Sequence, residues 1–210
     1  MGGFDRDFLE LPDEVLVMVM RKHQRYFPVY EAQPDGRRRL LPYFITVANG
    51  PIDREAVREG NEAVLRARFS DARFFYREDL KTKLADLRPA LAGTLFQKDL
   101  GSMLDKSMRA ERLIEPLARA TGLDAAAGVA LEAARLFKND LASSMVMEMT
   151  ALHGTMGRHY AEKEGMRSEV SGGILLPDCR PPDRDPCSAS DRPRAGVDRC
   201  VRGRAPPVGR

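Results

Sequence analysis

The chain of 210 residues has no tryptophan, and its three cysteines, Cys179, Cys187 and Cys200, all lie in the last forty residues. The first 170 residues therefore have no thiol for a disulfide, a cysteine metal site or a cysteine nucleophile. No apolar run approaches the roughly 18 residues of a membrane span, so no membrane partner is predicted. The N-terminus, MGGFDRDFLELPDEV, is acidic and mixed, which fits neither a signal peptide nor a transit peptide.

Residues 1–170 also lack an excess of either charge, with 26 Lys or Arg against 26 Asp or Glu. Residues 171–210 hold eight Arg and five Asp, so they supply the whole net charge of +3. A basic net charge can indicate a nucleic-acid partner. Here the charge belongs to the last segment, so it does not indicate a basic globular surface.

Residues 171–210 differ in composition from the rest of the chain, with seven of the fourteen prolines and no aromatic residue. Such a segment cannot bury enough apolar area to offset the entropy lost on ordering, so we predict that it is disordered. A GC-rich coding region read out of frame gives this kind of composition, which makes a frameshift one hypothesis. A genuine basic tail and a retained intron are the alternatives.

Residues 1–53 form the part of the chain in which strands are expected. Residues 26–30 (YFPVY) and 40–48 (LLPYFITVA) are aromatic and β-branched, and the turn signal Pro34-Asp35-Gly36 separates them, which predicts a hairpin. Pro28 and Pro42 argue that neither strand is a fully paired central strand.

From Arg54 the period of the apolar residues changes to that of helices. Helices are predicted over 61–83, over 84–98 with a break at Pro89, and over 101–120, 125–153 and 155–163. The fold class is therefore α+β, with a small β-containing N-terminal part followed by a mostly α-helical region over 54–170.

Sequence signals for catalysis are absent or weak. There is no Gly-x-Ser-x-Gly elbow, no Walker loop and no Gly-x-Gly-x-x-Gly. Of the three histidines, His153 and His159 are six residues apart, not the four that place two imidazoles on one helix face. We therefore predict no catalytic residue and no metal, and interpret His23, His153 and His159 as ordinary polar or partly buried side chains.

Arginines recur along one helix face, because Arg66, Arg73 and Arg77 have spacings of seven and four. Cations in such a row can follow a phosphate backbone. The alternative is an ordinary solvated face, because acidic residues are interleaved with them.

A second basic stretch, Lys22-His23-Gln24-Arg25, stands directly before Tyr26 and Phe27. Aromatic rings beside cations can stack on bases and contact a nucleotide. Both rings fit a place in the core equally well, so the sequence leaves this choice open.

Five ordered motifs resemble consecutive motifs of the glycyl-tRNA synthetase β subunit over residues 8–170. They are FLELPDEVLVMVMRKHQRYFPVY, LLPYFITVANG, EGNEAVLRARFSDARFFYREDLKTKL, LFQKDLGSMLDKSMR and ALHGTMGRHYA. Words such as KHQRYF and GNEAVLRAR are unusual, which makes the resemblance specific. It implies an internal fragment of a longer β subunit.

The resemblance implies an enzyme that joins glycine to tRNA(Gly) and uses ATP and Mg²⁺, with adenylation in an α subunit or a fused α segment. The β subunit binds the tRNA, so Arg66, Arg73, Arg77, Lys22 and Arg25 become candidate tRNA contacts. The fragment is expected to bind no cofactor and to be inactive alone. A bacterial source implies the cytoplasm. A eukaryotic source, slightly favoured, implies the chloroplast, with the mitochondrion second.

The second half of the body resembles the HD-type helical domain of these β subunits, but the His-Asp position reads Asn139-Asp140. An amide is a poor replacement for an imidazole metal ligand, so we expect Asp140 to bond to its neighbours. A degenerate HD phosphohydrolase and a non-catalytic module that binds an α-subunit partner are the alternatives. We also expect an incomplete core, with exposed Met and Leu side chains over 131–156.

Overall fold

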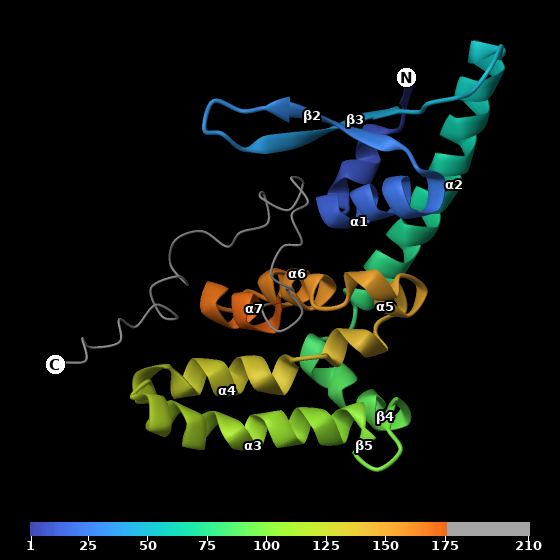
Figure 1. The fold of residues 1–210 in the computed structure, drawn as a ribbon. Helices are drawn as coiled ribbons and strands as arrows, with labels where there is room; N and C mark the ends of the chain where they lie inside the picture. Colours follow the sequence, from blue (N-terminus) through green and yellow to red (C-terminus); the bar gives the residue numbers. More distant parts are fainter. Residues whose placement is uncertain (176–210) are drawn as a thin grey trace, which may run out of the picture.

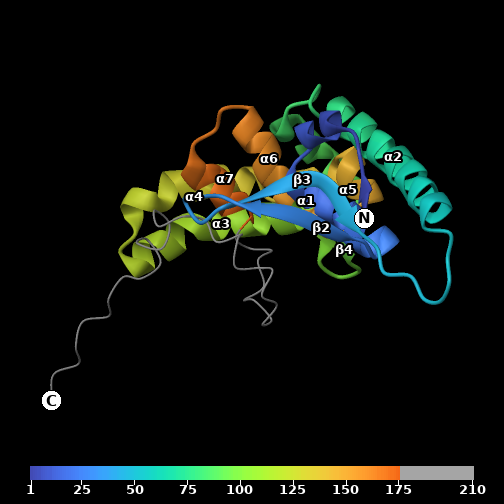
Figure 2. The same cartoon turned by 90° about the horizontal axis from the view of Figure 1, so that it is seen from above.

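The computed structural model describes residues 1–175, apart from the side chain of His23. Figure 1 shows a small sheet above the short helix α1 (Asp13–Met18), with the long helix α2 (Arg54–Asp79) running down one side to a layer of helices. Figure 2 shows that the hairpin β2–β3 extends over α1. The α+β class predicted from the sequence is confirmed. Within the described residues, no helix is long and apolar enough to cross a membrane.

The sheet has the strand order β1-β3-β2 and is antiparallel, with β1 (Gly2–Gly3), β2 (Phe27–Ala32) and β3 (Arg38–Ile45). The predicted hairpin is confirmed. Strand β3 is the central strand but is not fully paired, as predicted, because β1 pairs only with Tyr43 and Phe44. The register shifts between Pro28 and Tyr30, and Pro42 lies in the part of β3 opposite this irregularity. Its missing N–H therefore costs no ladder hydrogen bond.

The buried face of the sheet packs on helices that carry apolar side chains at helical spacing. Leu40 and Phe44 point into this core, and Tyr26 stacks on Phe44 with ring centroids 4.8 Å apart. Helix α2 contributes Leu65 and Phe69, which are fully buried. The 3-10 helix η1 (Arg6–Glu10), α1 and the π-helix η2 (Val19–His23) complete this half of the core.

Helix α2 begins at Arg54, where the apolar period of the sequence changes. The Asp53 carboxylate caps it by accepting hydrogen bonds from the backbone N–H groups of Glu55 (3.0 Å) and Ala56 (3.1 Å). Its buried residues, which follow one another at intervals of three or four, are Leu65, Phe69, Ala72, Tyr76 and Asp79.

Among the later elements, the helices predicted over 101–120 and 155–163 are confirmed as α3 (Met103–Thr121) and α6 (Thr155–Lys163). The helix predicted over 84–98 is partly wrong, because η3 (Leu84–Gly93) is a 3-10 helix and a two-stranded pair, β4 (Leu95–Gln97) with β5 (Gly101–Ser102), follows it.

The single helix predicted over 125–153 is wrong. Lys138 has a left-handed backbone with φ 70°, which ends the helical path after residue 136. The segment consists of η4 (Asp124–Ala126), α4 (Ala127–Leu136), η5 (Asn139–Ala142), α5 (Ser144–Glu148) and η6 (Thr150–Leu152).

Helix α7 (Ser168–Leu175) buries Val170, Ser171 and Ile174. Residues 171–175 were predicted to begin the disordered segment, and that part of the prediction is wrong. A Cβ on Gly173 would lie 2.9 Å from the Cβ of Ala133, so this glycine lets α7 approach α4 closely. The predicted disorder of residues 176–210 lies outside the described residues.

The prediction that Met and Leu side chains over 131–156 are exposed is mostly wrong. Met145 in α5 and Met156 in α6 are fully buried, whereas Met147 is well exposed. Well-exposed apolar side chains occur outside this segment, for example on α3, where Leu113 and Leu117 are 63% and 60% exposed.

Asp79 joins the end of α2 to two later helices. Its carboxylate accepts hydrogen bonds from the N–H groups of Ser144 (2.8 Å) and Met145 (2.9 Å) at the start of α5, and from the hydroxyl of Tyr160 (2.8 Å) in α6. Burial and the Asp79 charge raise the pKa of Tyr160, so the hydroxyl stays protonated and donates.

We predict that Asp79→Ala lowers the free energy of unfolding by about 3 kcal/mol, because three buried donors lose their acceptor. Urea denaturation measures the change. Asp71→Ala, at an exposed position of the same helix, is the matched control and should change stability by less than about 0.5 kcal/mol. Equal effects of the two substitutions would contradict the assigned role of Asp79.

Candidate functional site

The three arginines on one face of α2 (Arg66, Arg73 and Arg77) differ in their contacts, because a carboxylate from η1 lies near two of them. Arg77 Nη2 lies 2.8 and 3.0 Å from the two carboxylate oxygens of Glu10. The Arg73 guanidinium lies 4.7 Å from the centre of the Phe8 ring, and its Nε is 3.9 Å from Glu10 Oε1. Arg66 is exposed and forms no ion pair within residues 1–175. The three cations thus share a face but not an environment.

Lys22 lies in η2 and Arg25 on the connection from η2 into β2, and both are exposed. Arg25 has a left-handed backbone with φ 56°. Tyr26 is a core residue, whereas the Phe27 side chain is 58% exposed. Of the two rings, Tyr26 therefore has the place in the core that the sequence left open, and Phe27 does not. The structure brings η2 against α2, so both basic segments belong to the same half of the molecule.

Asn139 and Asp140 are fully buried at the junction of η5 with α6. Asp140 Oδ2 accepts hydrogen bonds from the N–H groups of Gly154 (2.6 Å) and Gly157 (3.0 Å), at the start of α6. The Asn139 amide donates to the carbonyl oxygen of Leu84 at 3.1 Å. Asp140 thus acts as a helix cap, and both side chains tie separate segments together.

Metal-ligating groups do not gather elsewhere in the described part of the chain. Over residues 1–175, no set of three or more His, Cys, Asp or Glu side chains is placed to hold a metal ion. His159, which the sequence suggested as an ordinary polar residue, lies 3.0 Å from a carboxylate oxygen of Glu14.

Glu14 is a polar residue that sequence reasoning missed. It connects α1 to α6, because Arg158 donates to its Oε1 at 2.6 Å and His159 contacts its Oε2 at 3.0 Å. Burial alone would raise the pKa of Glu14, but the hydrogen bond and charge of His159 and the charge of Arg158 outweigh it and lower the pKa to about 2. The partners lie more than 140 residues away in the chain, so no local pattern could have indicated them.

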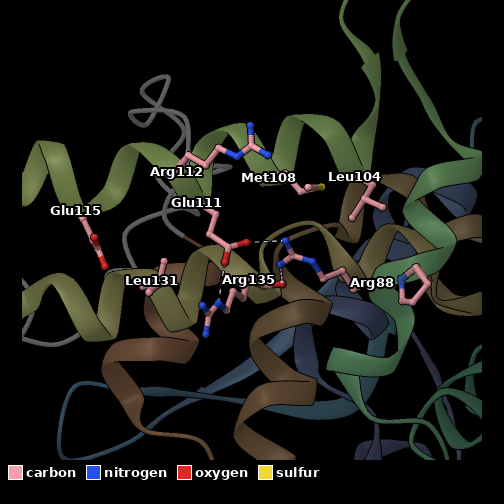
Figure 3. Close-up of a pocket in the computed structure, with 9 residues that line it drawn as sticks. Arg88, Leu104, Met108, Glu111, Arg112, Glu115, Leu131 and Arg135 are labelled. Atoms are coloured by element: carbon pink, nitrogen blue, oxygen red, sulfur yellow. Dashed lines mark hydrogen bonds and ion pairs between the residues drawn. The ribbon is translucent and has the colours of Figure 1, made fainter.

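A groove of about 750 Å³ lies between η3, α3 and α4 (Figure 3). On its wall Glu111 accepts hydrogen bonds from Arg88 (2.6 Å) and Arg135 (2.8 Å). The hydrogen bond from Arg135, with further help from Arg88, lowers the pKa of Glu111, so this carboxylate is a weak base. Leu104, Met108 and Leu131 make the lining apolar. The groove is suited to binding rather than to acid–base chemistry.

The described residues thus define an α+β scaffold whose buried polar groups hold helices together, and whose exposed cations are available to a partner. The sequence of residues 1–178 matches the family model described as glycyl-tRNA synthetase beta subunit. The chain belongs to this family of aminoacyl-tRNA ligases, which confirms the resemblance stated above.

Individual relatives agree with the family match. A chloroplastic/mitochondrial glycine–tRNA ligase of Arabidopsis thaliana is 45% identical over 176 residues, which cover 83% of this chain and 16% of that protein. The glycine–tRNA ligase beta subunit of Halothermothrix orenii is 47% identical over 82% of this chain and 25% of its own length. That of Haemophilus influenzae is 46% identical over 80% and 24%. The chain therefore spans 16% to 25% of the length of these relatives.

The close packing around Asp140 predicts that Gly157→Ala destabilises the fold. A Cβ at Gly157 would lie 2.8 Å from Ile174 Cγ2 and 3.2 Å from Asp140 Cγ. We expect a loss of about 2 kcal/mol in the free energy of unfolding, measured with urea. Gly128→Ala is the matched control, because that helical glycine has open space around it, and it should stabilise by up to about 1 kcal/mol. The same sign for both variants would contradict this packing.

The low pKa of Glu14 predicts a pH-dependent contribution to stability. The folded-state pKa lies below the ordinary value of 4.5, so the contribution is present above about pH 4.5 and is lost as the pH falls towards about 2. Glu14→Gln should cost on the order of 2–3 kcal/mol near pH 5.5, and the difference from wild type should shrink on acidification. Urea denaturation over this pH range measures it. Glu59→Gln, at an exposed site, should give no such trend.

Proposed function

We propose that this chain acts as part of the tRNA-binding β subunit of glycine–tRNA ligase and supports the ATP-dependent attachment of glycine to tRNA(Gly). The match of residues 1–178 to the β-subunit family carries this proposal. The complete enzyme would use ATP and Mg²⁺ and would include an α subunit or a fused α segment. The described residues would help to position the tRNA, since holding a substrate in place is itself a large part of catalysis.

The proposed location follows the relatives. The Arabidopsis relative is named chloroplastic/mitochondrial, which supports the chloroplast, and the mitochondrion second, for a eukaryotic source. The bacterial relatives support the cytoplasm for a bacterial source.

For the tRNA contacts we propose Arg66 first, then Lys22 and Arg25. All three are exposed, and a solvated cation can replace the counterions of a phosphate. Arg73 and Arg77 belong to the same proposed face, but each must share its charge with Glu10. We therefore expect a smaller contribution to affinity from these two residues.

For Asn139 and Asp140 we propose a structural role in place of the metal chemistry of an HD phosphohydrolase. The Asp140 carboxylate is directed at the N-terminus of α6, where it accepts two backbone hydrogen bonds. A cation at this carboxylate would compete with the helix cap.

We predict that Arg66→Ala weakens binding of tRNA(Gly) by the full chain about threefold to tenfold and lowers the slope of log affinity against log salt by about 1, as for the loss of one phosphate contact. Fluorescence anisotropy over a series of salt concentrations measures both quantities. The larger change Arg66→Glu should weaken binding further.

Arg119→Ala, an exposed arginine on α3, is the matched control and should bind as wild type does. An absence of salt-dependent affinity for tRNA in the wild-type chain would refute the proposed function. Equal affinities of the wild type and Arg66→Glu would refute the contact. We also expect the purified chain alone to attach no glycine to tRNA, which an aminoacylation assay tests.

A further inference from the structure

The outer face of the hairpin β2–β3 exposes three large side chains that lie together, which we call the hairpin platform: Phe27, Tyr43 and Ile45. Phe27 pairs directly with Ile45 across the strands, so both point to the same face. Tyr43 is two residues before Ile45 on β3 and shares that face by strand alternation. The opposite face carries Leu40 and Phe44, which are buried in the core.

The platform is unusually exposed for apolar side chains in one cluster. Phe27, Tyr43 and Ile45 are 58%, 39% and 45% exposed. Neighbouring apolar side chains of this size on one face indicate a contact surface more often than isolated ones do. Two of the three are aromatic, and ring faces suit planar ligands.

The stretch of sequence that contains the platform residues carries an excess of positive charge. Residues 21–45 contain six Lys or Arg and two Asp or Glu, an excess of four positive charges that acidic residues in the rest of residues 1–170 balance. Asp35 pairs with Arg37 at 3.0 Å, and Glu31 pairs with Arg39 at 2.8 Å. Arg25 immediately precedes the core residue Tyr26 at the base of the hairpin.

Two other cations of this stretch lie at opposite ends of the hairpin. Arg25 lies two residues before Phe27, whereas Arg38 lies near the tip and, two residues before Leu40, on the face opposite the platform. Both are exposed, and neither forms an ion pair among the residues that the structure describes. Aromatic rings beside an exposed cation, here Arg25, match a ligand that alternates flat apolar groups with negative charges.

We propose that the hairpin platform binds unpaired nucleotides of RNA, with bases stacked on Phe27 and Tyr43 and a phosphate near Arg25. A duplex hides the faces of its bases, whereas single-stranded segments expose them to aromatic side chains. The excess of positive charge favours a polyanion over an apolar protein surface. The inference rests on the proposed function, in which the RNA is tRNA, and assigns its unpaired nucleotides to this hairpin.

The test uses the full chain and a single-stranded RNA of about ten nucleotides that carries the fluorescent base 2-aminopurine. Stacking on the platform should quench the fluorescence, and a duplex of the same sequence should bind more weakly. Phe27→Ala and Tyr43→Ala should each reduce affinity about fivefold to tenfold, the size expected for a lost base stack.

Two further substitutions separate stacking from simple apolar contact. Phe27→Leu keeps an apolar side chain without a ring and should lose as much affinity as Phe27→Ala, whereas Phe27→Trp should retain affinity and quenching. Phe74→Ala is the matched control, because Phe74 is 60% exposed on α2, and it should bind as wild type does. Circular dichroism checks that each variant is folded.

The outcomes distinguish this proposal from the proposed function. Full affinity of Phe27→Leu, or no quenching with the wild-type chain, would overturn the stacking site. Binding of tRNA that Phe27→Ala and Tyr43→Ala leave unchanged would overturn the hairpin proposal alone. If the fluorescence of the oligonucleotide is quenched but the chain has no affinity for tRNA, the result would support the platform and refute the proposed function.

Discussion

The buried carboxylate of Asp79 is the interaction on which the helical half of the molecule depends. A carboxylate removed from water requires donors in its place, and here two backbone N–H groups of α5 and the hydroxyl of Tyr160 supply them. One side chain at the end of α2 thereby fixes the position of two later helices. Asp140 repeats this solution one helix further on, at the start of α6.

Other carboxylates that resemble parts of a functional site also form bonds within the molecule. Asp140 caps a helix, Glu14 joins α1 to α6, and Glu10 shares the charge of Arg77. Each carboxylate is directed at a group of the same molecule. Arg66 of α2 and Arg25 at the base of the hairpin remain, and a phosphate backbone could meet them without first breaking an internal ion pair.

Local charge proves more informative than net charge in this chain. The net charge of +3 arises from residues 171–210, yet residues 21–45 hold an excess of four positive charges that acidic residues elsewhere in the body balance. Under the proposed function, this local excess would meet the phosphates of tRNA. The chain spans a quarter or less of the length of its relatives.

The sequence by itself determined the hairpin, the helices α3 and α6 and the family, because turn signals, apolar periodicity and ordered motifs are local or collinear. It also determined that a helix covers most of residues 61–83, although α2 begins at Arg54, seven residues before the predicted start. It also brought Arg66, Arg73 and Arg77 onto one face. Only the tertiary structure decided that Glu10 lies within ion-pair distance of two of these cations and that Tyr26 is buried while Phe27 is exposed. It also decided that residues 125–153 are broken into short helices. Those outcomes depend on contacts with carboxylates and rings from segments distant in the sequence, and helical periodicity does not predict such contacts.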